Sequence, residues 1–397
     1  MTRHSILEYA QAIRPRYVKA TKEEKGKILD EFAKVTDLHR KAAIRLINRL
    51  NHPTTRKRCG RRPTYGPDVA AMLKEIWEAS DRLCSRRLQP FLPEMIRVLR
   101  KHGEKYINAD MEARLCRMSS STIDRLLRPA RRTGGRKPIS TTHAGNLLKS
   151  YIPIRTFADW QENKPGFVEI DLVAHCGEST EGTYLHTLCA VDIASGWTEC
   201  LPLSSKWQEK VRQAVHHMRQ RLPFPLLGID SDNGGEFINR CFFKYCRDEK
   251  ITFTRSRSYK KNDSCYVEQK NGNVVRRLIG YQRYSTKSAL ECMNRVYDAV
   301  RMYINFFQPT MKLVSKTRFG SKVHRVYDTA QTPYQRLLRS GMVSEAKQSE
   351  LAAIYVGLNP VQLRAQLDGH LENLWRLADR TVGNRNFDAT KATLVTV

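Results

Sequence analysis

Apolar residues recur at helical spacing through the first part of the chain. Thr21 and Glu24 form a capping-box pattern ahead of one apolar stripe, and a second stripe follows a break at Thr36-Asp37. The outer face of the second predicted helix is basic. Two short helices with a tight break, the second of them basic, favour a DNA-binding helix-turn-helix over residues 1–53. Any small helical bundle shares this pattern.

A second helical pattern covers residues 67–130. The Gly-Pro-Asp triplet at 66–68 opens its first predicted helix, a second helix ends near Gly103, and a third begins at the serine run 119–121. The last of these helices is again basic. We therefore expect a second helical DNA-binding unit in this region.

Basic, turn-rich linkers follow both helical units, at 54–66 and 131–150. Each contains Gly, two basic residues and Pro, namely Gly60-Arg61-Arg62-Pro63 and Gly135-Arg136-Lys137-Pro138. Arg-rich arms of this kind can lie in narrow minor grooves of DNA, and solvated interdomain linkers have the same composition. Both interpretations stay open.

After residue 151 the apolar period changes from helical to strand-like. Three consecutive strands precede alternating helices and strands, which predicts a mixed five-stranded α/β sheet over 151–315. The predicted strands are 165–175, 183–193, 196–203, 226–230 and 251–255, and the predicted helices are 206–221, 235–249, 265–280 and 287–307. Residues 316–397 lack a strand pattern, so we expect a loop, then helices at 333–340, 344–355 and 360–378, and a frayed tail.

The charge balance indicates what kind of partner the protein binds. The 397 residues include 69 Lys and Arg against 40 Asp and Glu, a net charge of +29. Residues 1–150 carry +19 of that charge and the remaining residues carry +10. An excess of this size, concentrated in the helical front part, points to nucleic acid rather than to solubility alone.

Other classes of protein are excluded by what the sequence lacks. No stretch approaches 18 consecutive apolar residues, and the N-terminus has no apolar signal-peptide core. The ten cysteines include no C-x-x-C pair, so we expect reduced cysteines and no structural zinc site. These features favour a cytoplasmic protein.

Three carboxylates stand out as candidate chemistry. Asp171 lies inside the apolar strand FVEIDLVA, where a buried charge needs a partner or a metal. Asp232 follows a short apolar strand in the loop SDNGGEF, and Glu268 lies at the start of a predicted helix, with 35 residues between the two. Because strand ends meet at one edge of an α/β sheet, we expect the three side chains to converge there.

The residues VEIDLV, SDNGGEF and VEQKNGNVVRR resemble the DDE transposases of bacterial insertion sequences, whose core is shared with retroviral integrases. The segments IASGWTE (193–199) and NFFQPTMKL (305–313) are also similar to that family. The resemblance covers residues 150–315. It implies a ribonuclease-H fold in which Asp171, Asp232 and Glu268 are the catalytic and metal-binding residues.

The resemblance also implies the cofactor and the reaction. Two Mg²⁺ ions, for which Mn²⁺ can substitute, would be held by Asp171 between Asp232 and Glu268. Water would attack in strand cleavage and a DNA 3′-hydroxyl in strand transfer, with no covalent protein–DNA intermediate. Joining two DNA ends implies a homodimer or larger assembly on double-stranded DNA, at the element ends and the target.

Several neighbours of the three carboxylates have other expected roles. Glu169 and Asp230 share strand faces with Asp171 and Asp232 and compete for their roles. Asn233 and Glu236 would support the loop or contact DNA. His175 is expected to be exposed in a turn, and Asp192 to form one.

One departure from the family concerns the residue that holds the DNA end. A basic residue is expected four or seven positions after the Glu, but Gly272 and Val275 occupy those positions. Gly272 also suggests close approach of a backbone, or a plain kink. The residues expected to contact DNA are Arg40, Arg45, Arg61, Arg62, Arg125, Arg128, Arg136, Lys137, Asn233, Lys260, Lys261, Lys270 and Arg276.

The sequence thus predicts a multidomain transposase that binds the terminal inverted repeats of its element and then cleaves and joins DNA strands. Two alternatives remain. One is a ribonuclease-H-like nuclease that cuts without joining. The other is a domesticated helix-turn-helix regulator in which the carboxylates are only structural.

Overall fold

The computed structural model describes residues 1–49, 64–131, 164–257 and 264–379. The chain divides into two compact units, Met1–Thr64 and Tyr65–Val397. Each unit has its own hydrophobic core. Among the described residues, no helix is both long and apolar enough to cross a bilayer.

The first unit contains three helices, α1 (Arg3–Lys19), α2 (Lys22–Thr36) and α3 (Arg40–Arg49). The predicted capping box forms, since Thr21 and Glu24 cap the start of α2. Asp37 ends that helix in the left-handed conformation, which makes the tight break before α3. A small core holds the helices together, comprising Ala10, Leu29, Phe32, Ala43 and Ile47.

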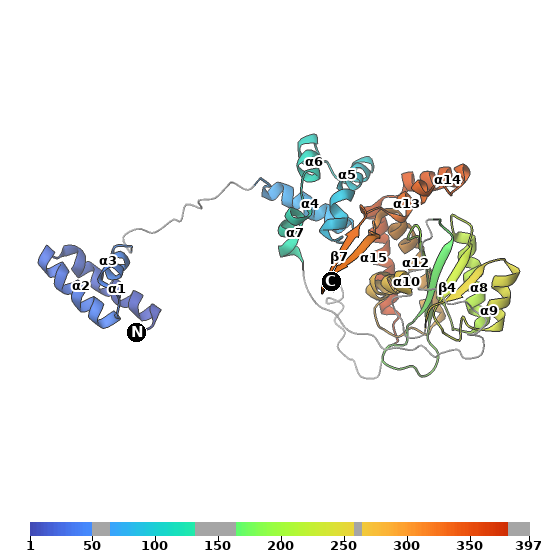
Figure 1. Ribbon diagram of the computed structural model, residues 1–397, viewed down its shortest axis with the longest axis horizontal. Helices are drawn as coiled ribbons and strands as arrows, with labels where there is room; N and C mark the ends of the chain where they lie inside the picture. The colour runs from blue at the N-terminus through green and yellow to red at the C-terminus, as the bar shows by residue number, and fades with distance from the viewer. Residues whose placement is uncertain (50–63, 132–163, 258–263, 380–397) are drawn as a thin grey trace. The chain divides into compact units, whose positions relative to one another are not determined.

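The second unit is built around a mixed five-stranded sheet of order β3-β2-β1-β4-β5 (Figure 1). The strands are β1 (Phe167–Ala174), β2 (His186–Asp192), β3 (Thr198–Leu203), β4 (Gly228–Ser231) and β5 (Thr252–Arg255). β1, β2 and β3 form an antiparallel meander, while β4 and β5 run parallel to β1. The predicted mixed sheet is confirmed.

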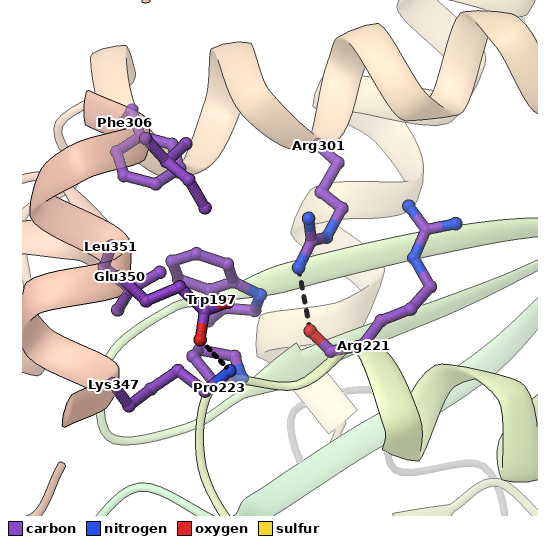
Figure 2. A pocket seen from close by; sticks show the side chains of 9 residues that line it. Trp197, Arg221, Pro223, Arg301, Phe306, Lys347, Glu350 and Leu351 are labelled. Carbon is purple, nitrogen blue, oxygen red and sulfur yellow. Dashed lines mark hydrogen bonds and ion pairs between the residues drawn. The ribbon is translucent and has the colours of Figure 1, made fainter. Parts of the chain in front are cut away.

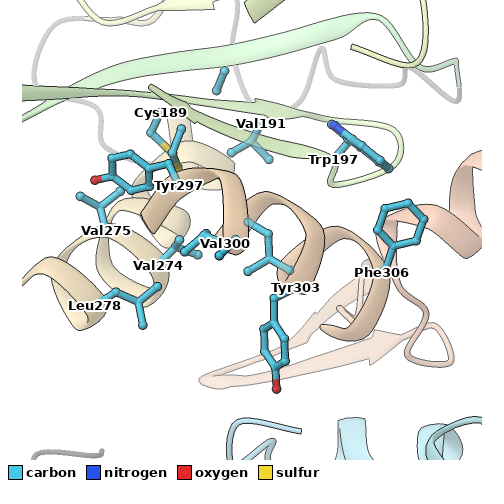
Figure 3. Packing of buried hydrophobic residues seen from close by; sticks show 14 of the residues in the cluster. Cys189, Val191, Trp197, Val274, Val275, Leu278, Tyr297, Val300, Tyr303 and Phe306 are labelled. Atoms are coloured by element: carbon cyan, nitrogen blue, oxygen red, sulfur yellow. The ribbon is translucent and has the colours of Figure 1, made fainter. Parts of the chain in front are cut away.

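Helices cover both faces of this sheet (Figure 1). On one side lie α8 (Gln208–Arg221) and α9 (Arg240–Asp248), and on the other lie α10 (Cys265–Lys270), α11 (Arg277–Ile279) and α12 (Lys287–Phe307). Figure 3 shows Tyr297 and Val300 of α12 beneath Cys189 and Val191 of β2. Burying apolar side chains between these layers is the main stabilising contribution to the fold.

Four helices precede the sheet in the same unit: α4 (Pro67–Ala79), α5 (Ser85–Lys101), α6 (Ala109–Cys116) and α7 (Ser120–Leu127), of which α6 was not predicted. The turn after α4 is tied to the sheet region. Asp81, which is buried, accepts from Arg277 and from Arg364. The Tyr303 hydroxyl donates to the carbonyl of Ala79 at 2.6 Å. This helical region therefore packs against the helices beside the sheet and belongs to the same compact unit.

The C-terminal part corrects one expectation. Residues 313–327 form a β-hairpin, β6 (Leu313–Phe319) and β7 (Lys322–Tyr327), where a loop was predicted. The predicted boundary at 315/316 falls inside β6. Because both faces of the hairpin are exposed, its sequence lacks the apolar alternation that marks a half-buried strand. The helices α13 (Pro333–Ser340), α14 (Glu345–Gly357) and α15 (Pro360–Arg376) follow close to their predicted positions.

Candidate active site

Two strands bring acidic residues to one edge of the sheet. In β1, Glu169 and Asp171 point to the same face because they are two residues apart. In the parallel register Glu169 lies opposite Asp230, and Ile170 lies opposite Ser231. Asp171 and Asp232 each come one position later. The strands therefore carry a deeper acidic pair and an outer acidic pair, one above the other.

The outer pair and its neighbours repel one another. Desolvation raises the pKa of Asp171 well above its usual range, and the charges of Asp232, Glu236 and Glu268 raise it further. The Leu172 amide opposes this effect by donating to Asp171 Oδ1 at 2.7 Å. Asp232, from the loop after β4, and Glu268, from α10, thus both act electrostatically on Asp171 of β1.

The deeper pair is more strongly enclosed. Glu169 is fully buried, and burial raises its pKa to about 8, with the charges of Asp230 and Glu268 as further contributions. Its Oε2 accepts from the Val267 amide at 2.8 Å, which links β1 to the start of α10. Its Oε1 has no hydrogen-bond partner among the described residues. Glu169 therefore ties the helix that carries Glu268 to the strand that carries Asp171.

The helix with Glu268 has an irregular continuation. After α10 ends at Lys270, residues 271–276 form a π-helical turn before α11. Asn271 Nδ2 donates to Asp171 Oδ2 at 2.7 Å. A π-turn accommodates one more residue than an α-helical turn, and such turns are frequent at functional sites. Arg276, eight positions after Glu268, consequently moves toward the angular place of the seventh.

Arg276 is the basic residue that fits the site best. It is partly buried, lies over the Tyr281 ring at 5.1 Å from the centroid, and interacts electrostatically with Asp171. Burial lowers the pKa of its guanidinium. The structure gives no neighbour within 4 Å of a Cβ added at Gly272, so this glycine is not required by a close backbone within the described residues.

Lys270 corrects another expectation. Its side chain was predicted to contact DNA, but the residue is only 8% exposed. Burial lowers its pKa to about 8, and its nearest electrostatic partners are Cys189 and Cys200. A lysine enclosed between the helix and the sheet is not positioned to bind phosphate. The helix turns Lys270 inward because it follows Glu268 by two positions, which places the two on different faces.

Other predicted residues have varied surroundings. Asn233 donates to the carbonyl of Ser256 at 2.8 Å and accepts from Arg255 at 3.1 Å, so it supports the loop that holds Asp232. Asp192 forms the expected turn by accepting from the Ser195 amide at 2.7 Å. His175 is fully buried, contrary to the expected exposed turn, because the chain pairs with Leu185 and Tyr284 beyond the end of β1.

The predicted DNA contacts divide by location. Arg45, Arg125 and Arg128 are exposed on α3 and at the end of α7, and exposed Arg40 pairs with Asp30. Arg61, Arg62, Arg136, Lys137, Lys260 and Lys261 lie outside the described residues. The structure thus leaves the linker arms untested.

The donor set of the site fits a hard cation. Within the described ranges, no group of three or more His, Cys, Asp or Glu residues stands in an arrangement that could hold a metal ion. The surroundings of Asp171 are nevertheless oxygen-rich and dominated by like charges. Carboxylate oxygens are what Mg²⁺ prefers, and a cation there would relieve the repulsion that raises the pKa of Asp171.

Sequence reasoning missed Asn271, the residue that orients Asp171. A signal was present, because Asn271 follows Glu268 by three positions and a helix places such residues on one face. The buried Glu199 was also missed. It accepts from Arg301 Nε at 2.6 Å and from Trp197 Nε1 at 2.9 Å. Glu199 is structural, as its two cationic partners indicate.

Comparisons with known proteins identify relatives of the whole chain and of its core. The family model described as "Integrase core domain" matches residues 161–261. The "Uncharacterized protein y4rM" of Sinorhizobium fredii (strain NBRC 101917 / NGR234) is 42% identical over 334 residues, covering 83% of this chain and 94% of the relative.

Solved structures of integrases were also found. The HTLV-2 integrase catalytic core domain in complex with magnesium is 18% identical, with a TM-score of 0.28, over 37% of this chain and 90% of that chain. The simian T-cell lymphotropic virus intasome in complex with PP2A regulatory subunit B56 gamma is 16% identical, with a TM-score of 0.31, over 60% of this chain and 73% of that chain. The fold assignment rests on the family match and the sheet topology.

Proposed function

Because this chain belongs to the family of the rhizobial protein y4rM and carries an integrase core domain, we propose that it is a transposase. It binds the ends of its mobile element and then cleaves and joins DNA strands. The observation that carries this proposal is the parallel register of β1 and β4, which puts Asp171 and Asp232 side by side, together with the carboxylates of Asp232, Glu236 and Glu268 that raise the pKa of Asp171.

In this proposal Asp171, Asp232 and Glu268 would hold two Mg²⁺ ions, which would supply charge stabilisation for the attacking and the leaving oxygen. Asn271 fixes the rotamer of Asp171 through its hydrogen bond. Glu169 holds the start of α10 against β1, and so sets the position of Glu268. Asn233 keeps the Asp232 loop against the end of β5.

DNA binding is assigned to the basic helical regions. Arg45 on α3 and Arg125 on α7 are exposed, α3 is short and basic, and exposed Arg128 follows directly at the end of short α7. Arg276 beside Asp171 would contact a phosphate near the reacting strand end. Two ends must be held together during joining, so the proposal includes a dimer or larger assembly on double-stranded DNA.

Strand joining tests the proposal. Purified protein is mixed with Mg²⁺ or Mn²⁺, DNA flanking its gene and a supercoiled plasmid, and nicked and joined products are measured for wild type and Asp232→Asn. Joined products that disappear in the variant are expected. Nicking without joining would indicate a nuclease, and DNA binding without any metal-dependent product would indicate a regulator.

A further inference from the structure

The hairpin β6–β7 is exposed on both faces. Every residue from Val314 to Tyr327 is exposed, including Val314 at 67% and the tip residue Phe319 at 75%. Neither strand packs extensively against another helix or strand of the described residues. An isolated two-stranded hairpin is marginally stable in water. This hairpin therefore presents a surface that gains stability when a partner covers it.

The base of the hairpin is, in contrast, firmly anchored. Lys312 donates through Nζ to the carbonyls of Ile193 and Ala194 in the turn between β2 and β3. Asp328 accepts from the Lys312 amide at 2.7 Å and from Arg336 at 2.6 Å. The arm thus extends from a fixed point on the catalytic core (Figure 1).

The charge on the hairpin identifies the kind of partner. Residues 313–327 contain four Lys or Arg and no Asp or Glu. Lys316 lies directly opposite Arg325, and Arg318 shares their face two residues along the strand. Among the described residues, no carboxylate forms an ion pair with any of these three cations. Like charges directly opposite each other destabilise a hairpin, so this face is built for an anionic partner.

We propose that the hairpin β6–β7 is a DNA-binding arm that places Lys316, Arg318 and Arg325 against the phosphates of duplex DNA. A two-stranded β-ribbon fits the major groove of B-DNA. A second copy of this chain is a poorer occupant, because it carries the same net charge of +29. The inference rests on the proposed DNA-acting function and adds a contact that starts from the core itself.

The first test measures binding of the full-length protein to a labelled 40-base-pair duplex of arbitrary sequence, in EDTA, across a salt series. Arg325→Glu is the informative variant because it replaces the like-charge pair by an opposite-charge pair with Lys316, which favours the hairpin fold. We expect about tenfold weaker binding at physiological salt and a salt slope reduced by about 1. Lys210→Glu, an equal charge change at an exposed position on α8, is the control.

The second measurement is amide hydrogen exchange of wild type with and without the duplex. Protection of residues 313–327 on adding DNA, together with the weaker binding of Arg325→Glu, supports the arm. Equal binding by wild type and Arg325→Glu overturns it, as does protection that depends on protein concentration without DNA, which would identify a second copy.

The outcomes also separate this inference from the proposed function. If wild type does not bind the duplex, both fail. If wild type binds and joins strands while residues 313–327 stay unprotected, only the arm is refuted. EDTA keeps the binding measurement independent of the strand-joining reaction.

Discussion

Two carboxylates of the same sheet, buried Glu199 and half-buried Asp171, are treated in opposite ways. Glu199 on β3 is 1% exposed and pairs with both Arg221 and Arg301, which lie beside Trp197 in Figure 2. Asp171 on β1 has Asp232, Glu236 and Glu268 as electrostatic neighbours, and Arg276 acts on it as well. Cys189 faces Asp171 across the strands and Cys200 faces Cys189, so Glu199, next to Cys200, points to the opposite face.

The different surroundings of Glu199 and Asp171 distinguish a carboxylate that stabilises the fold from one that belongs to a functional site. A buried charge that serves only the fold is neutralised by side chains of the chain itself, as Glu199 is. The charges of Asp232, Glu236 and Glu268 raise the pKa of Asp171, and a cation bound there would relieve this effect. The contrast therefore supports a metal site more strongly than the presence of acidic residues does.

The largest effect is expected when Asp171, which lies among the other carboxylates, is substituted. Asp171→Asn should reduce strand joining by at least about 1000-fold and yet raise the thermal stability of the metal-free protein, because one repelling charge is removed. Thermal unfolding with and without Mg²⁺ checks this. The Mg²⁺-dependent rise in Tm should disappear in Asp171→Asn and persist in Glu372→Gln, which changes an exposed carboxylate on α15. A retained rise would refute the metal assignment of Asp171.

Substitution of Glu199 should lower stability, whereas substitution of Asp171 should raise it. Glu199→Gln leaves Arg301 and Arg221 without their buried carboxylate, so the free energy of unfolding should fall by about 3 kcal/mol. Urea denaturation measures the loss. The Mg²⁺-dependent rise in Tm should remain. If Glu199→Gln were as stable as wild type, the structural role given to the two arginines would be wrong.

The smallest expected effect concerns His175, a buried side chain that stays neutral in the folded protein. Burial lowers the pKa of His175 to about 3, with the charge of Arg276 as a second cause, and its Nε2 lies 2.7 Å from Thr187 Oγ1. The unfolded chain, with an ordinary histidine pKa near 6.5, binds more protons in acid. Stability is therefore complete above pH 6.5 and is lost as the pH falls toward 3, by about 2 kcal/mol at pH 5.

Denaturation at pH 7 and pH 5 measures this loss. His175→Gln keeps a hydrogen-bonding side chain that does not titrate, so its stability should depend less on pH than that of wild type. The matched control is His217→Gln on the exposed side of α8, which should leave the pH dependence unchanged. An identical acid response in His175→Gln and wild type would contradict the neutral buried histidine.

Most of the fold could be predicted from the spacing of apolar residues along the chain. The five strands of the sheet were predictable because each buries at least one face, and α4 because Gly66 and Pro67 mark its start. The hairpin was not, since exposure of both faces removes the alternation. Helix α6 lies in a short polar stretch whose one buried apolar side chain is Leu115, too little for a stripe.

The candidate site was predictable only in part. The position of Asp171 followed from a carboxylate inside an apolar strand, and that of Asp232 from a carboxylate directly after a short strand. The inward orientation of Lys270 and the burial of His175 depend on which element packs over them, and local spacing does not record that. The hydrogen bond from Asn271 joins positions 100 residues apart, so it depends on the tertiary fold.

The π-helical turn at 271–276 has a meaning at the level of the gene. The turn contains one residue more than a regular α-helix would need here, and that residue is encoded by one additional codon. Removal of three bases at Gly272 would keep the reading frame and restore regular helical bonding, and it would leave the arginine seven positions after Glu268 at about the same angle around the helix. Comparison of related genes at this codon should therefore find insertions and deletions matched by a shift in the position of the arginine.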